Sequence, residues 1–241
     1  ALLYLHHRPN DYKTLFYIAF LPGLFAILAS LLLKDKPTTA AGSRAPVSFF
    51  SFLRYWKESP AAYKKLVVGL LAFALFNSSD VFLLLKAKES GLDDTHVIGV
   101  YVFYNLIYAL CAFPLGALAD KIGLKTVFLS GLLVFAAVYF GMAFNTNIYG
   151  FLGLFFLYGV YAAATEGISK AWISNISDKK DTATAIGTFS GLQSICAMMA
   201  STLTGFLWFR FGAATAFVAT TLVTIITAAY VLTSIPRPST D

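Results

Sequence analysis

The chain reads Gly116-Ala-Leu-Ala-Asp-Lys-Ile-Gly-Leu-Lys125 between two long apolar runs, 96–119 and 126–144. Each run has the length that an α-helix needs to cross a bilayer, at about 1.5 Å per residue. A connection of only about six residues forces the two helices to be antiparallel neighbours, and its charges keep it in water. The segment therefore predicts a tight polar turn in which glycine supplies the backbone angles.

The composition is that of a membrane protein. Hydrophobic residues make up 58% and charged residues 12% of the 241 residues, against about 45–50% and 25% in soluble domains. The net charge of +6 comes from basic residues between the apolar runs, so membrane orientation explains it better than nucleic-acid binding. We therefore expect an all-α, polytopic membrane helix bundle that contacts lipid and binds no nucleic acid.

Seven apolar runs divide the chain into three parts. Residues 1–33 hold a polar approach and a first span, residues 34–65 form a basic linker, and residues 66–241 hold six further spans. We expect seven transmembrane helices, at 14–33, 66–85, 96–119, 126–144, 148–173, 183–208 and 213–232. Within the linker, the amphipathic stretch 47–56 predicts a short helix that lies in the headgroup region or packs on the protein.

The basic residues outside the spans are distributed unevenly between the two sides of the membrane. One side holds the linker, the turn at 116–125, the loop at 178–181 and the C-terminal tail, and it carries more than twice as many lysines and arginines as the other. Basic residues favour the cytoplasmic side. The linker and the C-terminus are therefore expected in the cytoplasm, with the spans in a plasma membrane or a bacterial inner membrane.

Polar side chains inside the apolar runs mark a candidate cavity for a solute or an ion, because such groups are costly in hydrocarbon unless they face a cavity or a partner. Asn77 and Asp80 interrupt the second span, and a polar stripe at 101–108 follows helical spacing along the third. Glu166 and Lys170 lie four residues apart in the order that favours an ion pair, so local pairing and a role in binding remain alternatives. The candidate cavity residues are Asn77, Asp80, Tyr101, Tyr104, Asn105, Tyr108, Tyr158, Tyr161, Glu166, Lys170 and Gln193.

The pattern G-x-x-x-D-K-x-G-x-K resembles the signature loop of the major facilitator superfamily of secondary transporters, with Leu124 where the family usually has a basic residue. In that family the loop joins the second and third helices of each six-helix half, on the cytoplasmic side. The resemblance implies that the chain holds the last helix of the first half, the linker and the whole second half of a twelve-helix fold. The missing first half would then be its partner.

The resemblance also implies a conformational role for the loop. In the family, the signature aspartate approaches the N-terminal end of a helix in the opposite half, where the macrodipole favours a carboxylate. A polar hairpin that only stays out of lipid is the alternative. The loop residues to which this role would apply are Gly116, Asp120, Lys121, Gly123 and Lys125.

Three functions are compatible with these features. The leading hypothesis is a secondary active transporter that moves a small solute by alternating access, driven by an ion gradient and most simply by protons. A transporter-like receptor or scaffold without transport is the first alternative. A membrane-embedded enzyme is the second, but it would need a nucleophile with a base or metal ligands at depth, whereas His6, His7 and His96 lie outside the spans or at their edge. We therefore predict no catalytic residues, no metal site and no cofactor.

Overall fold

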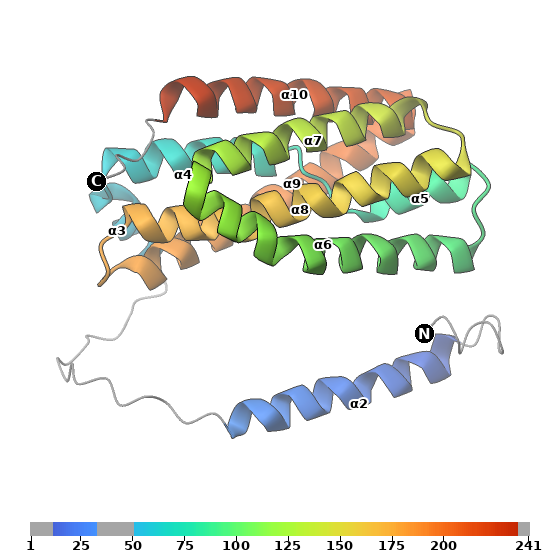
Figure 1. Cartoon of the computed structure of the whole chain (residues 1–241), viewed down its shortest axis with the longest axis horizontal. Coiled ribbons are helices and arrows are strands. Elements are labelled where there is room, and N and C mark those ends of the chain that lie inside the picture. Colours follow the sequence, from blue (N-terminus) through green and yellow to red (C-terminus); the bar gives the residue numbers. More distant parts are fainter. Residues whose placement is uncertain (1–11, 33–50, 236–241) are drawn as a thin grey trace. The chain divides into compact units, whose positions relative to one another are not determined.

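The computed structural model describes residues 12–32 and 51–235, and all its regular elements in these ranges are α-helices (Figure 1). The chain divides into two compact units, Ala1–Ser48 and Phe49–Asp241. The predicted all-α class is thus confirmed. The helices are α2 (Tyr12–Leu31), α3 (Ser51–Glu58), α4 (Ala61–Ala74), α5 (Val81–Glu89), α6 (Asp94–Ile122), α7 (Leu124–Phe144), α8 (Ile148–Ile176), α9 (Thr182–Phe211) and α10 (Ala213–Ser234).

Helix α2 is the described helix of the first unit. It has 20 residues with Pro22 inside it, and at about 1.5 Å per residue its length matches the hydrocarbon core of a bilayer. Phe20 and Phe25 are among the large apolar side chains that it exposes. Its bounds, Tyr12–Leu31, differ by two residues at each end from the first span predicted at 14–33.

In the second unit, α6 to α10 run up and down beside one another (Figure 1). These five helices, among the described residues, are long and apolar enough to cross a membrane, so they confirm five of the seven predicted spans. The α6–α7 and α8–α9 connections lie at the same end of the bundle, on the left of Figure 1. We call this end, which contains Gly123, the signature end.

The predicted span 66–85 is not one helix. Helix α4 ends at Ala74 and α5 begins at Val81. Residues 75–80 therefore lie outside both helices, and the polar sequence Asn77-Ser-Ser-Asp80 falls in this break. Ser, Asn and Asp side chains compete for backbone hydrogen bonds and are weak helix formers, so a run of four of them favours a break. Non-helical backbone at membrane depth is tolerated where it is buried in protein or lines a cavity.

Helix α3 packs on the protein, which answers the question left open for the stretch 47–56 within the described residues. It contacts α9, and the rings of Tyr55 and Trp56 lie 5.2 and 6.4 Å from the ring of Tyr63 on α4. The Tyr63 hydroxyl in turn donates to the Ala185 carbonyl on α9 at 2.9 Å. The last part of the predicted linker is therefore attached to the bundle at its signature end.

Helices α7 and α8 form the centre of the bundle. Phe135 on α7 and Phe155 on α8 are completely buried, and α7 also packs along α10 while α8 packs along α6. At Gly159 the approach of α8 to α6 is so close that a Cβ atom would lie 2.6 Å from the Tyr104 carbonyl oxygen. Glycine is therefore required there to let the two backbones meet.

Helix α6 begins with a side-chain cap at the end opposite the signature end. Asp93 precedes the helix, and its carboxylate accepts a hydrogen bond from the His96 backbone N–H at 2.8 Å. This bond and a contact with the His96 ring lower the pKa of the exposed Asp93 carboxyl. Lys88 forms an ion pair with Asp94 at 2.6 Å across the same loop.

Candidate functional site

Gly123 alone separates α6 from α7. Its φ of 93° lies in the left-handed region that side chains disfavour, and its N–H donates to the Ala119 carbonyl at 2.9 Å. The helices therefore extend further into the turn than the apolar runs 96–119 and 126–144 predicted. Helical bonding continues through Asp120 and Lys121, which face water, and through Lys125, which finds partners inside the protein. Gly116 lies within α6, and a Cβ there would meet nothing within 4 Å.

Asp120 and Lys121 are exposed on the last turns of α6. Asp120 and Gly116 line a cavity of about 230 Å³ between α6, α7 and α8, which we call the loop cavity. Tyr108 lines this cavity as well, together with Gly167 of α8. The structure therefore places Tyr108 on the loop cavity, beside Glu166.

Lys125 differs from the other loop residues because its side chain is buried, with 7% exposed. Its ammonium group donates to the Leu232 carbonyl at 2.8 Å and also to the Ile235 carbonyl. Both acceptors belong to the C-terminal end of α10, where the carbonyl dipoles favour a cation. Lys125 thus attaches the start of α7 to the end of α10, a structural role that the sequence pattern did not indicate.

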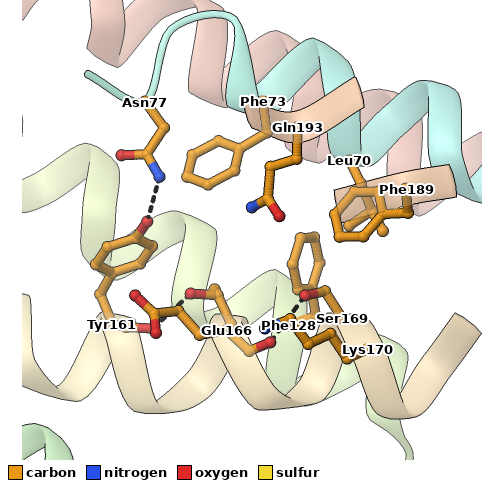
Figure 2. Close-up of a pocket in the computed structure, with 11 residues that line it drawn as sticks. Leu70, Phe73, Asn77, Phe128, Tyr161, Glu166, Ser169, Lys170, Phe189 and Gln193 are labelled. Atoms are coloured by element: carbon orange, nitrogen blue, oxygen red, sulfur yellow. Dashed lines mark hydrogen bonds between the residues drawn. The ribbon is translucent and has the colours of Figure 1, made fainter. Parts of the chain in front are cut away.

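A second cavity, of about 200 Å³, lies between α4, α7, α8 and α9. We call it the central cavity (Figure 2). In Figure 2, Asn77 and Gln193 point from the α4–α5 break and α9 toward side chains of α8. The residues that line it are Leu70, Phe73, Asn77, Phe128, Tyr161, Thr165, Glu166, Ser169, Lys170, Phe189 and Gln193.

Asn77 connects the helix break to the wall of the central cavity. Its Nδ2 donates to the Tyr161 hydroxyl at 2.9 Å (Figure 2). Tyr161 is held in place by aromatic packing, since its ring centroid lies 4.6 Å from that of Phe135 and 6.1 Å from that of Phe73. The cavity therefore has a polar wall of Asn77 and Tyr161, supported by rings of α4 and α7.

Glu166 and Lys170 line the same cavity and have exposed side chains. The two residues form no ion pair with each other in the part of the chain that the structure describes. The Glu166 carboxylate instead lies within electrostatic range of the hydroxyls of Tyr161 and Tyr108. Local pairing, one of the two alternatives raised by their spacing, is thus absent from this conformation.

The half-buried Asp80 and three buried tyrosines form a cluster beside the central cavity. The Tyr104 hydroxyl donates to an Asp80 carboxylate oxygen. The Tyr104 ring lies 5.2 Å from that of Tyr158, which lies 5.3 Å from that of Tyr161. Continuous ring contacts therefore connect Asp80 to the cavity wall.

Tyr101 and Asn105 lie away from both cavities. The Tyr101 side chain is 46% exposed, and the Asn105 amide donates to the Tyr101 carbonyl of its own helix at 2.8 Å. Helical spacing predicted the shared stripe but not which part of it the neighbours cover. Conversely, the central cavity contains residues that sequence reasoning missed because their types are ordinary in apolar spans: Leu70, Phe73, Phe128, Thr165, Ser169 and Phe189.

Comparison with known proteins identifies the family. The profile of the Major Facilitator Superfamily matches residues 81–241, more than half of the chain. The chain is 29% identical over 214 residues to the uncharacterized MFS-type transporter MJ1317 of Methanocaldococcus jannaschii, covering 86% of the chain and 52% of that protein. It is 28% identical over 145 residues to the chloramphenicol resistance protein CraA of Acinetobacter baumannii, covering 59% of the chain and 35% of that protein.

The chain thus spans about half the length of the first of these curated relatives and a third of the second. The profile match agrees with the resemblance of the segment 116–125 to the family's signature loop. It also agrees with the all-α bundle and with the five described helices that are long and apolar enough to span a bilayer. The chain belongs to the Major Facilitator Superfamily and is an integral, multi-pass membrane protein.

Proposed function

We propose that the protein is a secondary active transporter that moves a small organic solute by alternating access, with the central cavity as its half of the solute site. The observation that carries this proposal is the chemistry of the cavity wall, where a carboxylate, an ammonium group and two amides meet between helices. Charged side chains within a membrane-spanning helix are costly and mark solute or ion pathways. Membership of a transporter family points in the same direction and away from an enzyme.

The cavity wall favours a solute with an aromatic or alicyclic body and a polar group. Phe73, Phe128 and Phe189 provide apolar surface, while Glu166 and Gln193 provide hydrogen-bonding groups. A cavity with apolar walls and a few placed polar groups is the usual form of a small-molecule site. Because one relative is named for chloramphenicol resistance, chloramphenicol is the first probe that we would test.

Alternating access requires a second half against which this bundle rocks. We propose that this half faces the exposed side chains of Glu166 and Lys170. Asp120 would then approach the N-terminal end of a helix of that half and stabilise the state closed at the signature end. The excess of basic residues on that side supports a cytoplasmic location for the signature end and for the C-terminus.

We propose that an ion gradient drives transport and that Glu166 carries the coupling proton. The test uses the purified full-length protein in sealed vesicles with an imposed pH gradient, comparing Glu166→Gln, Lys170→Gln and the double variant. Glu166→Gln should lose gradient-driven accumulation and keep downhill exchange. Recovery of accumulation in the double variant would show that the two residues matter only as a pair. If the wild type transports none of the solutes tested, a receptor or scaffold is favoured instead.

The orientation is tested separately by cysteine labelling. Single cysteines replace Lys179 in the α8–α9 connection and Thr146 in the α7–α8 connection, both of which are exposed. A membrane-impermeant thiol reagent should label position 179 only from the cytoplasm and position 146 only from outside. Labelling of position 146 from the cytoplasm would reverse the proposed topology without affecting the proposal for the cavity.

A further inference from the structure

The break between α4 and α5 concentrates buried oxygen atoms that lack hydrogen-bond partners. Within the described residues, four buried side-chain atoms have no partner: Asn77 Oδ1, Ser78 Oγ, Tyr139 OH and Thr188 Oγ1. The first two belong to the break, and the Tyr139 hydroxyl of α7 lies close to Ser78 and within electrostatic range of Asp80. An unsatisfied buried polar atom costs about 1–3 kcal/mol. The neighbouring Ser78 and Tyr139 hydroxyls can relieve part of this cost by pairing with each other, which leaves lone pairs on both hydroxyls and on the Asn77 oxygen for a ligand.

The backbone of the break adds further oxygen atoms. The amides of Leu75, Phe76 and Asn77 donate back to carbonyls at 71 and 73. The carbonyls of residues 74–78 accept no hydrogen bond from any residue that the structure describes. They lie at the C-terminal end of α4, where the helix dipole is negative. Carbonyls freed by an interrupted membrane helix are the groups that coordinate cations in transporters.

The same place carries one negative charge. Asp80 accepts the Tyr104 hydroxyl through one carboxylate oxygen, and it forms no ion pair with a basic side chain in the described part of the chain. The Tyr139 and Tyr158 hydroxyls also lie within electrostatic range of it. The half-buried Asp80 carboxylate therefore has no basic partner among the described residues, and a cation at the break would balance its charge.

We propose that the α4–α5 break binds one sodium ion. The Asp80 carboxylate, the Ser78 and Tyr139 hydroxyls, the Asn77 side-chain oxygen and the free carbonyls of the break form its ligand set. Oxygen ligands suit hard cations, and a single carboxylate suits a monovalent ion better than calcium, which commonly takes several carboxylates. The inference concerns binding, so it goes beyond the proposed transport function and holds whether or not Glu166 carries a coupling proton.

Sodium at this place would also act on the solute site. Coordination of the Asn77 oxygen leaves its Nδ2 directed at the Tyr161 hydroxyl, which is the 2.9 Å hydrogen bond of the cavity wall. The ion would therefore fix one wall of the central cavity. Its binding and solute binding are then expected to favour each other, because each orders the same asparagine.

The test measures sodium binding directly on the purified full-length protein. Thermal unfolding is followed while NaCl replaces choline chloride at constant ionic strength, and ²²Na⁺ binding is measured in parallel. A ligand that binds only the folded state raises the unfolding midpoint, here by about 3 °C at saturation and by less with KCl. Asp80→Asn should abolish the response, and Tyr139→Phe should weaken the sodium affinity about tenfold through loss of one ligand.

Thr188→Val is the matched control. Thr188 is buried and its hydroxyl also lacks a partner, but it lies in an apolar groove between α4 and α9, so removing its hydroxyl should leave the sodium response unchanged. If Asp80→Asn fails to fold, Tyr139→Phe decides, because it keeps the ring that packs 4.2 Å from Phe135. A wild type with no sodium-specific shift, or a Tyr139→Phe variant with the full wild-type response, would overturn the proposal and leave an ordered water at the break. Binding without solute flux would refute the transport proposal alone.

Discussion

Substitution of Gly159 with alanine tests the packing that holds Tyr104 against Asp80. A Cβ at Gly159 would lie 2.6 Å from the Tyr104 carbonyl oxygen and 2.9 Å from the Ile107 Cβ. Both neighbours belong to α6 and the first is a backbone atom, so α6 and α8 must separate to admit a methyl group. Overpacking costs about 1–3 kcal/mol, and we expect about 2 kcal/mol here because a backbone atom cannot rotate away.

Gly153→Ala provides the matched control on the same helix. A Cβ at Gly153 meets nothing within 4 Å, and both substitutions gain the same helix propensity, about 1 kcal/mol over glycine. The difference between the two variants therefore isolates the packing. At about 2–4 °C per kcal/mol, the unfolding midpoint of Gly159→Ala should lie about 4–8 °C below that of Gly153→Ala.

The assay is the fraction of purified full-length protein that remains monodisperse after heating, measured by size-exclusion chromatography. Separation of α6 from α8 would also carry Tyr104 away from Asp80, so the sodium response should fall in Gly159→Ala and persist in Gly153→Ala. Equal midpoints in the two variants would show that α6 and α8 are not in contact at this position. That result would refute the packing and remove the support for a preformed Asp80 cluster.

Three further predictions concern the two ends of the bundle. Lys125→Met keeps an apolar stem but loses the donor to the end of α10, so it should destabilise the protein by about 2 kcal/mol, whereas Lys121→Met on the exposed surface should not change the unfolding midpoint. The pKa of Asp93 is lowered in the folded state. Its stabilisation of the start of α6 is therefore fully present above the ordinary pKa of 3.8 and is lost as the pH falls through the lower folded-state pKa. Hydrogen exchange at the start of α6 should then accelerate, and Asp93→Ala should remove this pH dependence. Asp120→Asn should leave expression near normal and impair transport, while Gly123→Leu should impair transport by straining a residue at φ 93°; unchanged flux in both would leave the loop as a passive hairpin.

The positions of the long helices could be predicted from hydropathy alone. The expected spans 126–144 and 213–232 correspond to α7 and α10 to within two residues at each end. Helix α9, expected at 183–208, extends to Phe211. The additional turn contains Arg210 and polar backbone that water can satisfy, so a search for apolar residues ends before the helix does.

The break at 75–80 could be predicted only in part. Its polar sequence was visible in an apolar run, but both flanks, α4 and α5, are apolar and the average hydropathy is that of one span. Whether a polar run stays helical depends on the partners that its side chains find in three dimensions. Here Asn77 donates a hydrogen bond to Tyr161, which lies 84 residues away in the sequence.

The remaining site residues depend on tertiary packing in the same way. From sequence alone, a lysine at the edge of a span is expected to be a surface cation. Nothing near Lys125 in the sequence indicates that carbonyls of α10 accept its hydrogen bonds. The stripe from Tyr101 to Tyr108 shares a helix face, yet α8 covers only part of it. Sequence spacing predicts which residues are neighbours on one helix, whereas burial and pairing are decided by the neighbouring helices.

Helix α6 connects the three places that the proposals invoke. Tyr104 donates to Asp80 at the helix break, and Tyr108, one turn further along, faces Glu166 and lines the loop cavity. Gly116 and Asp120 continue the same face at four-residue intervals to the signature turn. Because one helix of 29 residues, with Pro114 inside it, carries all of these groups, a displacement of Tyr104 or a change in the charge of Glu166 acts on the same helix that carries Asp120. Ion binding at the break and closure at the signature end can therefore be coupled through the position of one helix, without a separate chain of moving side chains.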